Sequence, residues 1–442
     1  MLASAAMERR FALASLVLVA ACSRGPAKDA AAGDASVPAA SDAGEVTVTP
    51  ASGPTTIFSA PIAGARVASG QAIAVGLVVA NRSITAARVD ATGHAVWARA
   101  ILNDVTWSQD AELHAWPIDA GALVVWRGPV GAKSAHVAVV VAPDGRTVDG
   151  PFDVGSFVCA TDDGAAWSEP GAKGTVVKLR AWSASGAHDV AGPTLSDDFT
   201  LTCGSHRAYA LVEGDEEAPS RVYTVGDPST TQPVRIAPSA LGRDEERDLF
   251  AWAEGDDVGV VRVAQSGSVT AADVRANAVT PLHLDSARVP PEDDVVAIDA
   301  DTRSVVLVTT HDESDACPDG HGGTSVHALR IARQDVGKTT SSLLSPSACA
   351  RDVGPFWTNL LGTSLVVAWT ERDAHAAKGA APISGLAYRA LEEGGTLARL
   401  ALSADALADA GCDATRCYAV ALAREPGADG MKPEAIRVVS YP

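Results

Sequence analysis

Long hydrophobic runs are missing from most of this 442-residue chain. Beyond residue 21, no stretch approaches the roughly 18 consecutive apolar residues that a membrane-spanning helix needs. Basic residues are also few, with 35 Lys and Arg against 54 Asp and Glu, which gives a net charge of −19. An acidic surface repels nucleic acid and anionic lipid headgroups, and no basic patch with interleaved aromatic residues is present. We therefore expect no nucleic-acid partner.

The sequence also lacks the short motifs that mark common catalytic sites. It contains no GxSxG, no HExxH, no P-loop, no CxxC and no GxGxxG after a strand. Enzymes that cleave glycosidic bonds use two carboxylates, and sequence spacing cannot pair such residues when they lie far apart. A non-enzymatic function is therefore favoured, and the question of an enzyme stays open.

One apolar run, residues 11–21, follows Arg9 and Arg10 and is too short to cross a bilayer. A basic region followed by such a run is typical of a secretory signal peptide. The run ends in Leu-Val-Ala-Ala-Cys, where small residues precede Cys22. This ending resembles that of bacterial lipoproteins, and the resemblance implies cleavage before Cys22 and lipidation of its sulfur. The alternatives are an ordinary cleaved signal with a chance cysteine, and a true start at Met7 instead of Met1.

The segment after Cys22 is rich in Ala, Gly, Asp, Ser and Pro and contains almost nothing bulky. Such a segment buries too little apolar surface to offset the entropy of ordering it, so residues 22–52 are expected to form a flexible tether. Ser23 stands where an aspartate would favour the inner membrane in some bacteria, so we expect the outer membrane, at its periplasmic face or the cell surface. The predicted organisation is a signal peptide (1–21), a tether (22–52) and one folded domain (53–442).

A strand–turn–strand pattern recurs along the folded domain. Its clearest copy, LFAWAEGDDVGVVRVAQSG at residues 249–267, is an apolar run, a charged tight turn, a second apolar run and a Ser-Gly turn. Copies laid over one another are 41 to 62 residues apart, a spacing typical of β-propeller blades. The equivalent positions are Ala80, Trp126, Trp167, Leu211, Trp252, Leu307, Trp369 and Leu422.

These copies predict an all-β fold, a β-propeller with eight blades, or with seven if the weakest copies merge. Each four-stranded blade packs on both neighbours, so ring closure leaves no apolar face uncovered. The last copy ends at the C-terminus without residues for an outer strand, whereas a strand-like segment, residues 53–64, precedes the first copy. We therefore expect the N-terminal strand to complete the last blade.

Taken together, the signal, the tether and the degenerate repeats resemble those of bacterial lipoproteins with an exported β-propeller domain. The resemblance implies a fold and a location, not an activity. The leading hypothesis is a monomeric, lipid-anchored binding or scaffold module of the cell envelope, whose loops or channel mouth face another protein or a glycan. The alternatives are a polysaccharide hydrolase or lyase on a propeller scaffold, and a sensor domain that binds Ca²⁺.

Six cysteines remain besides the lipidation candidate, an even number that suits disulfides in an oxidising compartment. Two of them lie in equivalent inner strands of consecutive copies, two lie in one tight hairpin, and two flank the sixth copy. Free buried thiols are the alternative. The predicted pairs are Cys159–Cys203, Cys412–Cys417 and Cys317–Cys349.

The tip of the sixth copy, residues 311–323, has the least ordinary composition of any loop. It carries enough carboxylate and imidazole donors for Ca²⁺ or Zn²⁺. Their spacing matches neither an EF-hand nor HExxH, so a solvated loop clipped by a disulfide is the alternative. No other cofactor is expected. The candidate ligands are His311, Asp312, Glu313, Asp315, Asp319 and His321.

In four copies an acidic residue lies two places after the equivalent position. Residues two apart on a strand share a face, so these glutamates are candidates for a ring of carboxylates at one mouth of the channel. The alternative is that the apolar positions pack between blades while the glutamates solubilise hairpin tips. Basic residues of the following strand, such as Arg180, are expected to bridge to acidic residues of the neighbouring blade or to lie along its apolar face. The alternative is that they line a channel and bind an anion or a sugar. The four candidates are Glu169, Glu213, Glu254 and Glu371.

Overall fold

The computed structural model is built almost entirely of strands. Its described part holds 34 strands, one short helix, α2 (Pro238–Leu241), and one 3₁₀ turn, η1 (Val79–Asn81). No helix among the described residues is long and apolar enough to cross a membrane. The structure describes residues 46–47, 55–60, 62–68, 71–108, 110–183, 185–196, 198–214, 218–226, 232–241, 246–275, 278–282, 287–301, 303–313, 322–333, 339–344, 350–351, 353–354, 356–361, 364–373, 383–390, 397–402, 406–412, 417–423 and 435–441.

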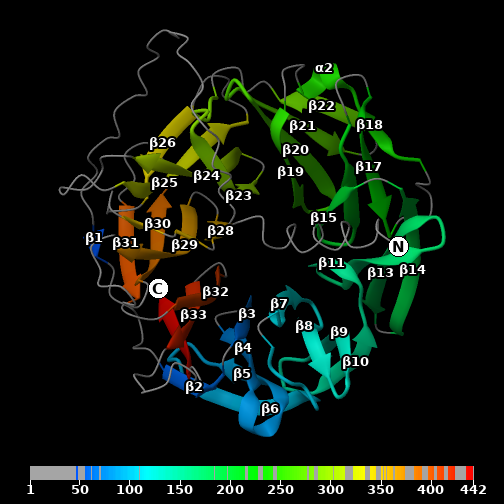
Figure 1. The fold of residues 1–442 in the computed structure, drawn as a ribbon, viewed down its shortest axis with the longest axis vertical. Helices are drawn as coiled ribbons and strands as arrows, with labels where there is room; N and C mark the ends of the chain where they lie inside the picture. The colour runs from blue at the N-terminus through cyan, green and yellow to red at the C-terminus, as the bar shows by residue number, and fades with distance from the viewer. Residues whose placement is uncertain are drawn as a thin grey trace.

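The described strands fall into eight sheets that are arranged around a ring (Figure 1). Each of the first four sheets is a four-stranded antiparallel meander in which consecutive strands pair. Their strands are β3 (Ala63–Ala68), β4 (Gln71–Val78), β5 (Ser83–Val89) and β6 (Ala95–Asn103); β7 (Glu112–Ile118), β8 (Gly121–Val130), β9 (Lys133–Val141) and β10 (Thr147–Asp153); β11 (Ser156–Ala160), β12 (Gly164–Gly171), β13 (Gly174–Ser183) and β14 (Gly186–Leu195); β15 (Phe199–Cys203), β16 (Ala208–Val212), β17 (Ser220–Val225) and β18 (Val234–Ile236).

The remaining four sheets continue the same meander. The seventh has six strands, because β1 pairs with β31 in parallel and β27 pairs with β29. The strands are β19 (Glu246–Glu254), β20 (Asp257–Ala264), β21 (Val269–Arg275) and β22 (Ala278–Leu282); β23 (Asp293–Ala300), β24 (Ser304–Glu313), β25 (Gly323–Ala332) and β26 (Thr339–Leu343); β1 (Val46–Thr47), β27 (Ala350–Arg351), β28 (Phe356–Leu361), β29 (Ser364–Asp373), β30 (Ile383–Ala390) and β31 (Leu397–Leu402); β32 (Ala406–Cys412), β33 (Cys417–Ala423), β34 (Ala435–Tyr441) and β2 (Thr55–Ser59).

The two ends of the folded domain meet in the last sheet. Strand β2 pairs antiparallel with β34, with Thr55 opposite Val438 and Ser59 opposite Ala435. In Figure 1 the blue β2 lies beside the red strands of the C-terminal sheet. The prediction that the N-terminal strand completes the last sheet is therefore confirmed. Strand β1 falls within the residues predicted as tether, and the signal peptide and Cys22 lie outside the described residues.

The first strand of each sheet lies on the inner side of the ring. These strands contact one another in sequence, from β3 through β7, β11, β15, β19, β23, β28 and β32 back to β3. Each sheet then runs outward from its first strand through the second and third to the fourth. The closed circuit of inner strands is the arrangement of a β-propeller.

Two of the eight equivalent positions were misassigned: Ala80 lies in the 3₁₀ turn η1 and not on a strand, and Trp252 lies on a different strand of its sheet from the others. Trp126 and Trp167 lie on β8 and β12, the second strands of their sheets, whereas Trp252 lies on β19, a first strand. The second strand of that sheet is β20. The two hairpins were confused because both consist of apolar strands joined by a tight turn that carries charged residues.

The core is divided into clusters that lie between neighbouring sheets. Trp252 is only 5% exposed and packs with Val261 of its own sheet and with Leu307 and Leu329 of the next sheet. Trp126 and Trp369 are fully buried in comparable clusters. The predicted packing of these tryptophans between blades is therefore confirmed, although Trp252 reaches its cluster from an inner strand.

Two of the three predicted disulfides are present. The bond between Cys159 and Cys203 joins β11 to β15, the first strands of consecutive sheets, with Cα atoms 5.7 Å apart. The bond between Cys412 and Cys417 closes the β32–β33 hairpin. The third predicted pair, Cys317–Cys349, lies outside the described residues.

Candidate functional site

One face of the ring carries the turns between the first and second strands of each sheet, and we call it the first-turn face. On four consecutive sheets these turns are joined by backbone hydrogen bonds. The N–H of Asp119 donates to the carbonyl of Asp162 at 2.5 Å, that of Asp162 to Ser205 at 2.6 Å, and that of Ser205 to Gly255 at 2.7 Å. These bonds cross from sheet to sheet and fix neighbouring turns relative to one another.

Side chains and a disulfide reinforce this chain of turns. The hydroxyl of Tyr209 donates to the carbonyl of Asp256 in the next sheet, and burial raises the pKa of Tyr209 to about 12. The N–H of His206 donates to Asp256 Oδ1 at 2.9 Å. The Cys159–Cys203 bond ends one residue before the Gly204 turn. The first-turn face is thus a rigid platform over sheets two to five.

A cavity of about 440 Å³ opens on this face between the third and fourth sheets. Leu179 and Val190 supply apolar lining, and the polar lining includes Asp163, His206 and Asp256. His206 Nδ1 lies 3.3 Å from Asp163 Oδ2. The cavity therefore offers hydrogen-bond donors and acceptors beside an apolar wall.

A second cavity of about 390 Å³ lies between the second and third sheets. Asp119 and Asp149 contribute carboxylates to its lining. Trp182 and Ser183, at the end of β13, line both cavities. Trp182 is thus the aromatic wall between two adjoining hollows on the rigid part of the face.

The orientation of Trp182 is set by the sheet on one side of it. Its Nε1–H donates to Asp149 Oδ2 at 2.8 Å, and Arg180 Nε donates to the same oxygen at 2.8 Å. Burial alone would raise the pKa of Asp149, but the hydrogen bonds from Arg180 and Trp182 and the charge of Arg180 outweigh it and hold that pKa below its ordinary value. Phe152 packs at an angle against Trp182, with ring centroids 6.2 Å apart. The expected bridge from Arg180 to a neighbouring blade is confirmed.

The opposite face carries the turns between second and third strands, and we call it the second-turn face. Glu169 lies near this face, where it accepts a 2.7 Å hydrogen bond from Trp167 Nε1 and pairs with Lys178 Nζ at 2.5 Å. Burial would raise the pKa of Glu169, but the contacts with Lys178 and Trp167 lower it overall. This glutamate is thus held by side chains of its own sheet.

The four candidate glutamates do not share one face. Glu213 follows the second strand β16, and Glu371 lies on the second strand β29, so both belong with Glu169 near the second-turn face. Glu254 instead ends β19, a first strand, and stands beside the turn at residues 255–256 on the first-turn face. The prediction that all four glutamates lie at one mouth of the channel is therefore wrong for Glu254. The repeat at residues 249–267 was aligned on the hairpin of the first and second strands, whereas the other repeats were aligned on the hairpin of the second and third strands.

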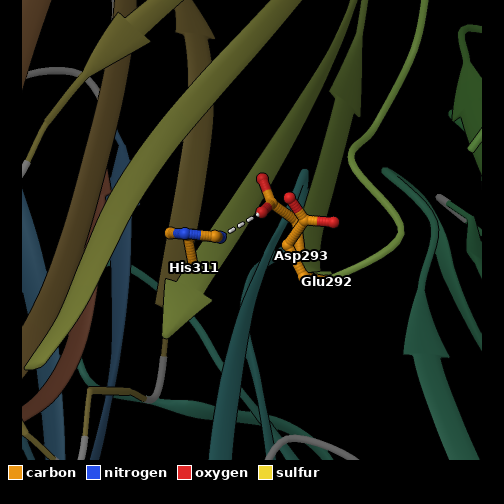
Figure 2. A group of neighbouring side chains, drawn as sticks. All are labelled: Glu292, Asp293 and His311. Atoms are coloured by element: carbon orange, nitrogen blue, oxygen red, sulfur yellow. Dashed lines mark hydrogen bonds and ion pairs between the residues drawn. The ribbon is translucent and has the colours of Figure 1, made fainter. Parts of the chain in front are cut away.

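A second candidate group of side chains lies at the second-turn face of the sixth sheet (Figure 2). Glu292, Asp293 and His311 bring one donor atom each to within 4.8 Å of one another. Asp293 begins β23 and pairs across the strands with His311 near the end of β24, and His311 Nδ1 lies 2.7 Å from Asp293 Oδ1. Burial raises the pKa of Asp293 above its ordinary value, although the hydrogen bond with His311 opposes the shift.

Only one of the six predicted metal ligands belongs to this group. Asp312 follows His311 on β24, is exposed, and accepts a 2.7 Å hydrogen bond from Thr324. The side chain of Glu313 and residues 314–321, which include Asp315, Asp319 and His321, lie outside what the structure describes. The sequence analysis did not identify Glu292 and Asp293 as ligands because they lie at the start of a different strand, β23. Only the register of β23 against β24 brings them to His311.

Comparison with known proteins addresses the fold alone. No protein-family model and no curated protein matches the chain. Among solved structures, the WD40 domain of SCAP from fission yeast is 10% identical with a TM-score of 0.46, over 89% of this chain and 98% of that one. The polysaccharide lyase Uly1 is 7% identical with a TM-score of 0.40, over 88% and 91%. TolB from Acinetobacter baumannii is 13% identical with a TM-score of 0.31, over 72% and 79%.

Proposed function

We propose that this protein is a non-enzymatic binding propeller of the bacterial cell envelope, anchored to the outer membrane through a lipid on Cys22. The observation that carries the binding role is the pair of cavities on either side of Trp182. Each has the size of a small-molecule or side-chain site, and together they offer room for an extended ligand. The ligand is an envelope glycan or a segment of an envelope protein.

The lining of the cavities suits a ligand with both apolar and polar faces. An indole ring stacks on apolar faces, while neighbouring carboxylates, imidazoles and a guanidinium can pair with hydroxyls, amides or charges. Around Trp182 these groups are supplied by Asp163, His188, His206 and Arg207. The hydrogen-bonded turns hold this surface in one arrangement before the ligand arrives, which reduces the entropy cost of binding.

The binding role is tested by capture from envelope extracts with the full chain in detergent. Wild type, Trp182→Ala, His188→Ala and the control Trp107→Ala are immobilised side by side. Trp107 is 44% exposed and lines neither cavity. Protein mass spectrometry and sugar analysis of the eluates should find one ligand on wild type and on Trp107→Ala, and at least about tenfold less on the cavity variants. Equal capture by all four proteins would refute the site.

The anchor is tested separately from the ligand. Cys22→Ser removes the only thiol to which the resemblance assigns a lipid. The variant should move from the outer-membrane fraction to the soluble fraction after cell lysis, because stable attachment depends on the acyl chains. Retention of Cys22→Ser in the membrane fraction would contradict lipid anchoring and leave the binding proposal standing.

A further inference from the structure

We infer that Glu292, Asp293 and His311 form a binding site for one divalent transition-metal ion of the zinc class. The site lies on the second-turn face of the sixth sheet, away from the cavities around Trp182. It is independent of the proposed binding role, so either can fail without the other.

The donor geometry is close to what such an ion needs. Zinc binds imidazole nitrogen and carboxylate oxygen at about 2.0–2.2 Å, so two donors on one tetrahedral ion lie about 3.3–3.6 Å apart. The three donor atoms of this group lie within 4.8 Å of one another, so no pair has to approach by more than about 1.5 Å to reach that spacing. Figure 2 shows the three side chains converging from β24 and from the start of β23.

Two of the three donors are joined by a hydrogen bond. His311 Nδ1 and Asp293 Oδ1 are 2.7 Å apart, closer than two ligands of one metal. A metal ion would replace the proton that these atoms share, with the atoms separating slightly and the proton released to solvent. Histidine then binds as the neutral imidazole through Nδ1 and keeps its proton on Nε2.

Asp293 is already oriented and already buried. It is only 6% exposed, its Oδ2 accepts a hydrogen bond from Thr309 at 3.3 Å, and its N–H donates to Pro290 at 3.0 Å. Such outer contacts fix the direction of a metal-binding carboxylate. A buried carboxylate is costly unless it is compensated, and a divalent cation compensates it more fully than one neutral imidazole does.

The mixed donor set selects the class of ion. Calcium and magnesium bind oxygen donors, whereas a site with one imidazole and two carboxylates suits zinc and similar first-row ions. Calcium, one of the two ions suggested from the sequence for the loop at residues 311–323, therefore fits these three residues less well. Three protein donors leave one tetrahedral position open for water or for an atom of a bound partner.

The test is calorimetric titration of ZnSO₄ into the full chain in detergent, after removal of any histidine tag. Wild type is compared with His311→Ala, Glu292→Gln and the control Asp312→Asn, which changes the adjacent exposed carboxylate on β24. We expect one zinc ion per chain, binding at least about tenfold weaker in the first two variants and unchanged in Asp312→Asn. CaCl₂ in tenfold excess should not displace the zinc.

Three results would overturn the inference. The side chain of Glu292 is exposed, so Glu292→Gln should fold normally. If its affinity for zinc equals that of wild type, Asp293 and His311 form only an ion pair. Displacement of zinc by calcium would refute the inference that the site prefers ions of the zinc class. The third result is zinc binding that persists in His311→Ala but is lost in the triple variant Asp315→Asn, Asp319→Asn, His321→Ala. That result would place the zinc ion in the loop at residues 311–323.

Discussion

The two faces of this propeller are built differently from the same repeats. On the first-turn face, the turns of sheets two to five are short and bonded to one another from Asp119 to Gly255. On the second-turn face, the described strands are joined by connections that range from residues 131–132 to residues 424–434. Inner hairpins contact both neighbouring sheets, so their length is constrained, whereas the connection between second and third strands can grow without disturbing the ring.

The two candidate sites differ in the same way: one lies between neighbouring sheets, and the other lies within a single sheet. The cavities around Trp182 lie between sheets, and their walls depend on how neighbouring sheets are fixed to each other. The group at His311 lies within one sheet, and it depends only on the pairing of β23 with β24. Changes to contacts between sheets should therefore affect the first site and leave the second intact.

The largest effect is expected from Trp252→Ala, which empties the cluster between the fifth and sixth sheets. Truncation of a large buried aromatic residue costs about 3–5 kcal/mol in free energy of unfolding, measured by chemical denaturation. The matched control, Trp107→Ala, removes an indole that is 44% exposed and should change stability by less than about 0.5 kcal/mol. A Trp252→Ala protein as stable as that control would contradict the packing of this residue between sheets.

The two disulfides allow contacts between sheets to be compared with contacts within a sheet, because one disulfide joins two sheets and the other lies within a hairpin. Their cysteines are 44 and 5 residues apart in sequence. On loop-closure entropy, replacing Cys159 and Cys203 by alanine should cost about 4 kcal/mol, and replacing Cys412 and Cys417 about 2 kcal/mol. Denaturation of the two double variants under oxidising conditions checks the order. If the loss of Cys412–Cys417 lowered the free energy of unfolding more than the loss of Cys159–Cys203, the inter-sheet disulfide would contribute less to stability than loop closure predicts.

The smallest effect concerns Asp149, whose pKa is lower in the folded protein than its ordinary value. Its contribution to stability is therefore fully present above the unfolded pKa, and it is lost as the pH falls through the lower, folded pKa. At pH 7, Asp149→Asn should cost about 1–3 kcal/mol, since hydrogen bonds to a charged group are lost.

The pH profile of unfolding separates this ion pair from a packing effect. The difference between wild type and Asp149→Asn should vanish in acid, whereas a packing defect would persist at every pH. The exposed Asp153 on the same strand supplies the control, Asp153→Asn. A difference for Asp149→Asn that does not depend on pH would rule out the charge as its origin.

Features that depend on local pattern were predictable from the sequence. Alternating apolar residues and tight turns predicted the strands, the counting of strands predicted the pairing of β2 with β34, and the repeat alignment predicted the bond between Cys159 and Cys203. The strands follow from local pattern, and the other two features follow from the order of the strands. The misplacement of Trp252 shows the limit, because inner and middle hairpins bury similar residues and only the neighbouring sheets distinguish them.

The two candidate sites depend on register and on contacts between sheets, which no local pattern specifies. Glu292 and Asp293 reach His311 only because Asp293 pairs with His311 across β23 and β24. Trp182 lies on the third strand of its sheet, and its partner Asp149 comes from the fourth strand of the preceding one. The run of three acidic residues at 292–294 can be seen in the sequence, but the partner of Asp293 on the next strand cannot.

Hydrogen exchange of the full chain in detergent, with and without zinc, tests the contrast between the two faces most directly. Exchange is read by mass spectrometry on peptides that cover the turns and the sixth sheet. We predict that the N–H groups of Asp119, Asp162 and Ser205 exchange as slowly as those of core strands, and that zinc slows exchange only around residues 292–293 and 311. Fast exchange at all three turns, or protection by zinc spread over the first-turn face, would contradict it.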